Sequence, residues 1–153
     1  MKAIYKGVAD ILLNDTDLKN MVGYTAKNMN IRRAYTPLGE WQKLVVFYLQ
    51  PAYPVTDFEQ RIRVSPLIVR VYDRDSDLSA DDVAERIILL LDGGNLSVKD
   101  EVFVYDSAYI GDLISTGWND ELKSFERVLR FNLIYRVDAV AGSSGYPTRK
   151  RKQ

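Results

Sequence analysis

The chain has 153 residues, of which 46% are hydrophobic and 27% charged, so it is long and apolar enough to form one globular domain with a substantial core. Its 21 basic and 21 acidic residues balance, which excludes a strong overall field toward nucleic acid or an anionic membrane. It contains no cysteine and no histidine, and this excludes disulfides, thiolate metal sites, Ser–His and Cys–His nucleophiles and most zinc sites.

The N-terminal segment is predicted to be helical. Over residues 2–14, four apolar residues fall on one stripe with helical spacing: Ile4, Val8, Ile11 and Leu12. Residues 14–17 then offer an N-cap for a short second turn of helix that ends at Gly23. Residues 24–40 are polar and mixed in pattern, and we expect a loop that holds a short strand at 31–35.

Two strands are predicted in the middle of the chain. Residues 43–50 are rich in β-branched and aromatic side chains, and Pro51 and Pro54 end that run. Residues 61–72 form the second strand, in which Pro66 predicts a bulge or an edge position. Residues 51–60 between them are expected to form the extended loop of a hairpin, an arm.

The second half of the chain is expected to continue with a helix and two strands. The helix is predicted over 80–92, with Ser79 as N-cap and Gly93 in the left-handed conformation at its end. A short strand follows at 102–105, and 106–123 is read as irregular. The last strand, 125–138, alternates with period two over its whole length, which is typical of a half-buried antiparallel strand.

These elements predict an α+β fold in which two helices pack on one face of a mainly antiparallel four-stranded sheet, with a hairpin arm. One domain is expected over residues 1–140. Residues 141–153, a Gly/Ser segment followed by four basic residues, are expected to form a flexible tail.

The turn between strand and helix is acid-rich and has two interpretations. Its five aspartates could hold calcium or magnesium, since hard cations take carboxylate oxygens: Asp73, Asp75, Asp77, Asp81 and Asp82. An EF-hand loop, however, needs glycine at its sixth position and glutamate at its twelfth, where Leu78 and Ala84 stand. The favoured interpretation is an acidic helix N-terminus, which the helix dipole alone explains.

Taken together, the pattern resembles the tail terminator (tail completion, or head-tail joining) proteins of long-tailed bacteriophages. The shared plan has a D-x-x-L-x-x-x-V-G segment at 15–23, strands at 44–50 and 67–73, an acid-capped helix ending near Leu-Asp-Gly at 79–94, and a long final strand at 125–138. Asp17-Leu18 with Val22-Gly23, and residues 88–94, are nearest to signatures. The resemblance covers roughly residues 2–140.

The resemblance implies a structural virion protein rather than an enzyme. Members of this family form rings, hexameric as a rule, that cap the head-proximal end of the tail tube and stop its polymerisation. The implied partners are further copies of the chain, the tail tube protein and the head-tail connector or neck protein, with non-specific contact to DNA passing through the ring. Neither a cofactor, a metal nor a membrane is implied. The resemblance also implies that the protein is synthesised in the host cytoplasm and resides at the head-proximal end of the virion tail.

The residues expected at an oligomer or tube interface lie on the arm and on the strand faces: Tyr53, Val55, Phe58, Arg61, Arg63, Arg130 and Arg136. The plainer interpretation of each arginine is a solvated sheet face with cross-strand ion pairs. Three alternative functions stay open. They are a head-closure or connector-stopper neck protein, a carboxylate and divalent-metal enzyme centred on 73–82, and an adaptor that binds a peptide by strand addition at an edge near Pro66.

Overall fold

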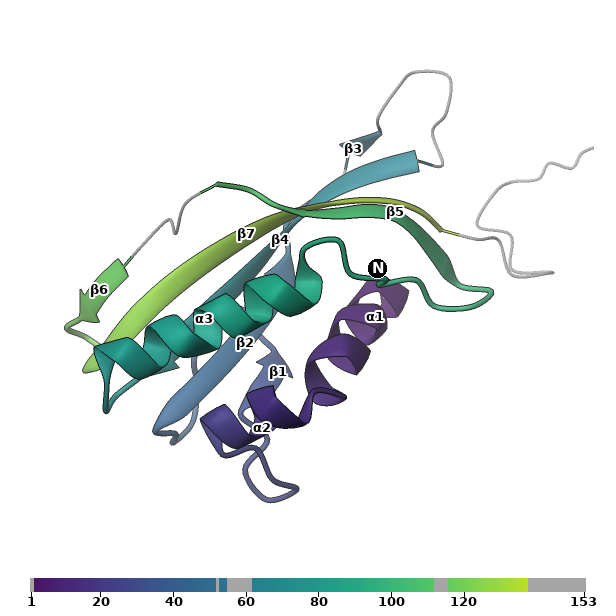
Figure 1. The fold of residues 1–153 in the computed structure, drawn as a ribbon. Helices are drawn as coiled ribbons and strands as arrows, with labels where there is room; N and C mark the ends of the chain where they lie inside the picture. Colours follow the sequence, from purple (N-terminus) through teal and green to yellow (C-terminus); the bar gives the residue numbers. More distant parts are fainter. Residues whose placement is uncertain (1, 52, 55–61, 112–115, 138–153) are drawn as a thin grey trace, which may run out of the picture.

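The computed structural model describes residues 2–51, 53–54, 62–111 and 116–137, and these form an α+β fold with one sheet (Figure 1). The helices are α1 (Lys2–Leu13), α2 (Thr16–Val22) and α3 (Asp77–Leu91). The strands are β1 (Ile31–Arg33), β2 (Lys43–Leu49), β3 (Tyr53–Pro54), β4 (Ile62–Asp73), β5 (Val102–Tyr109), β6 (Thr116–Asn119) and β7 (Ser124–Val137).

The sheet has seven strands rather than the four expected from the sequence, in the order β1-β2-β4-β7-β5, with β3 beside β4 and β6 beside β7. The pairing is mainly antiparallel, as predicted, and only β1 and β2 run parallel. The additional strands are short, with three residues in β1, two in β3 and four in β6. β1 confirms the short strand expected at 31–35, whereas β3 and β6 are too short to carry a recognisable periodicity.

Three helices, not two, lie on one face of this sheet (Figure 1). Between the two layers is a single large core, to which the predicted stripe of α1 contributes Ile4, Val8 and Leu12. The same face of β7 supplies Leu129, Phe131, Leu133 and Tyr135, which confirms the predicted alternation of the last strand. No helix of the described residues lies on the opposite face of the sheet, and we call it the open face.

The D-x-x-L-x-x-x-V-G segment is explained by the way α2 is held. The Asp15 carboxylate accepts a hydrogen bond from the backbone N–H of Leu18 at 2.8 Å, so it caps the helix as predicted. Leu18 and Val22 are buried, and Gly23 ends the helix at φ 71°, in the left-handed region. Asp15 also pairs with Arg86 of α3, whose guanidinium lowers the pKa of this carboxyl, and the pair joins α2 to α3.

The predicted start of α3 is wrong by three residues. The N-cap is Ser76, whose hydroxyl accepts from the N–H of Ser79 at 3.1 Å, and the helix begins at Asp77. The preceding Asp73 carboxylate accepts hydrogen bonds from the N–H groups of Asp75 and Ser76. These bonds turn the chain early, so the helix begins before the predicted residue. The hydroxyl of Ser79 instead accepts a hydrogen bond from the Lys43 ammonium at 2.7 Å.

The prediction that Pro66 marks a bulge or an edge is also wrong. β4 is central, with β2 on one side and β7 on the other, and its register with β7 continues unbroken past Pro66. The proline lies opposite Gln50, just beyond the end of β2, and its carbonyl accepts the Gln50 N–H at 2.9 Å. The Gln50 carbonyl, which would otherwise take an N–H from position 66, accepts the Ser65 hydroxyl at 2.8 Å. The missing donor of the proline is thereby replaced.

The outer edge of β5 is occupied by the loop that follows α3. Val102 exchanges backbone hydrogen bonds with Val98, and the Val104 N–H donates to the Ser97 hydroxyl at 2.8 Å. Farther along the strand, the Ser107 carbonyl accepts from the Gly93 N–H, and the Tyr109 N–H donates to the Asp92 carboxylate. An edge strand that would otherwise present unpaired backbone groups is thus covered by residues 92–98.

Candidate assembly surface

The open face is built from the alternate side chains of β2, β4, β7 and β5 that point away from the helices. Near the start of β2 it is covered by Trp41, which packs with Leu44, Val46 and Tyr72 in a second, smaller core. The Arg74 guanidinium lies 3.9 Å from the centre of the Trp41 ring and donates to its carbonyl. This end of the face is therefore closed by the chain itself.

The middle of the open face carries a charge pair in a partly buried setting. Arg70 of β4 donates to Glu126 of β7 at 3.2 Å, and its Nε lies 3.4 Å from the hydroxyl of Tyr48. Burial, with the nearby negative charge of Glu126, raises the pKa of Tyr72 to about 12, so its hydroxyl stays protonated. The predicted cross-strand neutralisation of strand arginines is confirmed at Arg70.

Two exposed aromatic side chains of β5 lie on the open face, beside a β-bulge. The register with β7 shifts between Val104 and Asp106, so Tyr105 is an extra residue. Phe103 and Tyr105, two positions apart on the strand, both point outward, with ring centres 4.9 Å apart, and they are 45% and 47% exposed. Arg136 of β7 donates to the Tyr105 hydroxyl at 3.3 Å and lies over both rings. We call Phe103, Tyr105 and Arg136 the aromatic–arginine cluster.

The structure separates the predicted interface residues. Arg136 and Arg130 both lie on the open face, but six residues apart on β7, which is about 20 Å in an extended strand. Nε of Arg130 is buried and has no hydrogen-bond partner among the described residues. Arg63 lies opposite Tyr135, on the helix-bearing side of the sheet. These three arginines therefore do not form one patch.

The arm is described only at its base. The backbone of Tyr53 and Pro54 pairs antiparallel with Val64 and Arg63, which confirms a hairpin stem. Val55, Phe58 and Arg61 lie outside the described residues, as does the basic tail at 141–153. Their proposed roles stay predictions.

Three of the five aspartates of the acidic turn are paired with cations of the protein itself. Asp73 is fully buried and pairs with Lys43 at 3.1 Å. Although its burial alone would raise the pKa, hydrogen bonds from Ser79, two backbone N–H groups and Lys43 hold the pKa of Asp73 below its usual value. Arg127 of β7 pairs with Asp77 and with Asp81, the latter at 2.7 Å. Among the described residues, no three acidic side chains come together in a group that could hold a metal.

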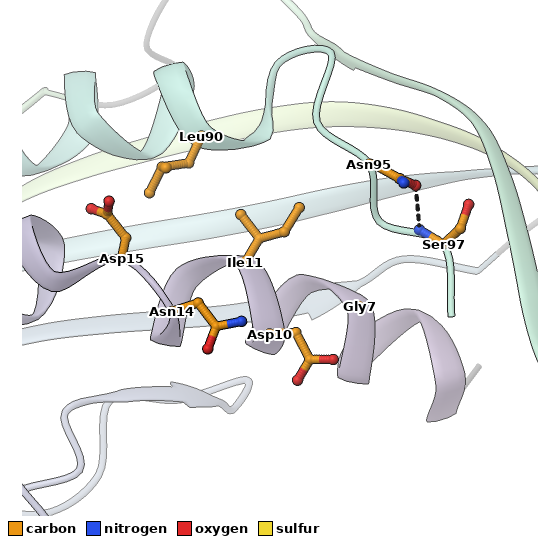
Figure 2. A pocket seen from close by; sticks show the side chains of 8 residues that line it. All are labelled: Gly7, Asp10, Ile11, Asn14, Asp15, Leu90, Asn95 and Ser97. Carbon is orange, nitrogen blue, oxygen red and sulfur yellow. Dashed lines mark hydrogen bonds between the residues drawn. The ribbon is translucent and has the colours of Figure 1, made fainter. Parts of the chain in front are cut away.

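A polar cleft of about 400 Å³ opens between α1, α3 and the loop after α3 (Figure 2). In Figure 2 Asp10, Asn14 and Asp15 line one side of it, and Asn95 and Ser97 line the other. Its floor includes Gly7, where the backbone of α1 approaches Leu96 closely. Its lining residues bring no nucleophile and base together, so they form no catalytic arrangement.

Two further hollows lie on the surface. One, of about 540 Å³, lies where β1 stops beside β2 and is lined by Tyr5, Tyr35, Tyr48 and Arg33. The Tyr5 hydroxyl there accepts the Leu49 N–H at 2.8 Å, and burial raises the pKa of Tyr5. The other, about 260 Å³, is an open groove on the helix layer, which we call the α2–α3 groove. Its lining residues are Met21, Asp82, Glu85, Arg86 and Leu89.

The chain resembles a virion protein in fold. A solved chain from the virion of a native gene transfer agent (GTA) particle superposes with a TM-score of 0.58, covering 85% of this chain and 90% of that chain. The two sequences are 16% identical, so the similarity concerns the fold. No protein-family model matches the sequence, and no curated protein matches it. No helix in the described part of the chain combines the length and apolar character needed to cross a bilayer.

Sequence reasoning missed Phe103 and Tyr105 as surface residues. Both are aromatic residues in a short predicted strand, where the usual expectation is burial. The available signal was the run Val102 to Tyr105, in which apolar residues occupy both parities and cannot all face one core. That pattern indicates either a strand buried on both faces or a surface with an exposed aromatic group.

Proposed function

We propose that this protein is a structural component of a phage-like particle, and specifically a tail terminator whose ring caps the tail tube and joins it to the neck. The observation that carries the proposal is the shared fold with a chain of the GTA virion over most of both chains. The resemblance of the sequence to tail terminators supports the same role independently of that superposition.

Features of the described residues favour assembly over catalysis. The surface offers exposed aromatic and arginine side chains of the kind that dominate protein–protein interfaces. Three of the five acids considered for a metal-dependent enzyme, Asp73, Asp77 and Asp81, instead anchor α3 through Lys43 and Arg127. The proposal assigns no cofactor, and its partners are further copies of the chain, the tail tube protein and the neck connector.

A reconstitution experiment tests the proposal. Purified protein is mixed with preformed tail tubes that lack their head-proximal end, and with capsids that carry a connector, and both are imaged in negative stain. We expect rings at one end of the tubes and an arrest of further tube growth. Binding to connectors without binding to tube ends would favour the head-closure alternative instead. Failure to bind either would refute a role at the head-tail junction.

The adaptor alternative is weakened by the described edges of the sheet. β4, which carries Pro66, is central, and the outer edge of β5 is occupied by residues 92–98. Strand addition at either place would have to displace existing hydrogen bonds. At these two places, side-chain recognition by the open face or the helix layer is therefore favoured over strand addition.

A further inference from the structure

The aromatic–arginine cluster and the α2–α3 groove have complementary chemistry. The cluster offers two exposed aromatic rings and the Arg136 guanidinium. The groove offers two exposed apolar side chains, Leu89 at 69% and Met21 at 38%, beside two carboxylates. Aromatic, arginine and methionine side chains are enriched at interfaces, and the carboxylates of the groove complement the charge of the arginine.

The charges of the groove are available for a partner. Within the described residues, the carboxylates of Asp82 and Glu85 form no ion pair, whereas Arg86 is already engaged by Asp15 at 2.6 Å. In the sheet, Arg70 is paired with Glu126 and Arg127 with Asp77, so these two arginines are also engaged within the chain. A cation that enters the groove therefore meets net negative charge.

The two surfaces lie on opposite layers of the molecule. The cluster lies on the open face at the β5–β7 end, and the groove lies on the helix layer (Figure 1). A contact between them must join different patches of two copies, which is a heterologous contact. Such head-to-tail contacts close into a ring when the rotation per copy divides a full turn. The placement thus fits the ring that the proposed function requires.

We infer that the aromatic–arginine cluster of one copy docks into the α2–α3 groove of a second copy, with Arg136 facing Asp82 and Glu85 and with Phe103 and Tyr105 against Leu89 and Met21. This inference rests on the proposed function for its biological setting, but its test does not. The cluster and groove form the centre of the contact, because a stable interface buries about 800 Å² per partner and needs flanking surface as well.

A single-stranded nucleic acid is the other class of partner that aromatic rings and arginine suit. The bulge argues against it, because it also turns Asp106 outward beside the cluster, and a carboxylate at that place repels phosphate. A protein surface of mixed charge tolerates Asp106, so we favour the second copy. Nucleic-acid binding becomes one outcome of the test.

The test is a charge swap in the full chain, read by sedimentation and native mass. Arg136→Glu and Glu85→Arg are each expected to raise the dissociation constant of the assembly about 100-fold, since like charges then face each other. The double variant is expected to return to within about tenfold of the wild type. Leu89→Asp, at an exposed position that a monomer tolerates, gives a second route to the same loss. Lys27→Glu and Glu121→Arg, exposed away from both surfaces, serve as matched controls.

Circular dichroism first shows whether each variant is folded, and the assembly measurements on folded variants then support or overturn the contact. Loss in both single variants with recovery in the double variant establishes the contact. Unchanged assembly in the single variants, no recovery in the swap, or a wild type that stays monomeric at every concentration overturns it. So does a single-stranded oligonucleotide that the wild type binds and Arg136→Glu does not, with the mass unchanged. Binding to tube ends is measured separately. If the charge-swap variants assemble as expected but the rings never cap tubes, only the proposed function is refuted.

Discussion

Replacing Gly7 by alanine should destabilise this protein, although alanine is the better helix former. Gly7 lies in the interior of α1, facing the loop after α3 at the floor of the polar cleft (Figure 2). A Cβ built there would lie 2.0 Å from the carbonyl oxygen of Leu96 and 3.0 Å from its carbonyl carbon. These are backbone atoms of a fully buried residue, so they cannot swing aside as the end of a flexible side chain can.

Two opposing contributions decide how Gly7→Ala changes the free energy of unfolding. Exchanging glycine for alanine inside a helix gains about 0.8–1.0 kcal/mol of helix propensity. Forcing an extra methyl group into a packed site costs typically about 1–3 kcal/mol, and more where backbone must move. Because the 2.0 Å approach is far inside van der Waals contact, we expect the steric cost to dominate, with a net loss of about 1–3 kcal/mol in the free energy of unfolding.

The assay is urea denaturation at constant m-value, followed by circular dichroism. Lys6→Ala, at the neighbouring exposed position of the same helix, is the matched control and should change stability by less than about 0.5 kcal/mol. A Gly7→Ala variant as stable as the wild type, or more stable, would refute the reasoning. Such a result would mean that helix propensity outweighs the steric clash, because the backbone at Leu96 can move away from the added methyl group.

Three further predictions follow from buried polar groups. The Asp73 carboxyl has a lowered pKa in the folded state, so its stabilisation is present above the unfolded pKa of about 4 and is lost as pH falls through the folded pKa. Asp73→Asn should therefore be less stable at neutral pH and lose less stability on acidification, measured by urea midpoints from pH 7 to about 2.5. Asp77→Asn with Asp81→Asn leaves the Arg127 guanidinium, 4% exposed, without its carboxylates and should cost about 3–5 kcal/mol. Arg127→Met should cost less because the two acids are half-exposed and can be hydrated, and the opposite order of thermal stabilities would contradict this. Ser65→Ala should cost about 1–3 kcal/mol, since the Gln50 carbonyl loses its donor, and adding Pro66→Ala should recover part of the loss by restoring an N–H. A double variant no more stable than Ser65→Ala would show that the new N–H of residue 66 does not donate to the Gln50 carbonyl.

The elements that the sequence predicts well are those whose signals are local. The stripe of α1, the Asp15 cap with Gly23, and the fourteen-residue alternation of β7 all depend on neighbours within a few positions. Arg127 interrupts the apolar face of β7 and, from the strand alone, looks like a defect. Its reason is the N-terminal turn of α3, which supplies both carboxylates from about fifty residues away in the chain.

The misses have physical causes of the same kind. Ser79 looked like the N-cap, but Lys43 engages its hydroxyl, and Asp73 starts the turn that makes Ser76 the cap. β5 was predicted to end at Tyr105 because the bulge there reverses the parity of the strand, so Asp106 and Ser107 no longer continue the period of two. Phe103 and Tyr105 share one parity of β5, and sequence periodicity did not place them because the other parity, Val102 and Val104, is apolar as well.

The occupied outer edge of β5 has a consequence for any particle built from many copies of this chain. Association through an open sheet edge has no built-in stopping point, because each added strand presents a new edge to the next. Here residues 92–98 take up that edge within each subunit, so sheet extension through β5 is blocked before assembly begins. Contacts between copies at this end of the sheet are then left to side chains, whose geometry can close on itself.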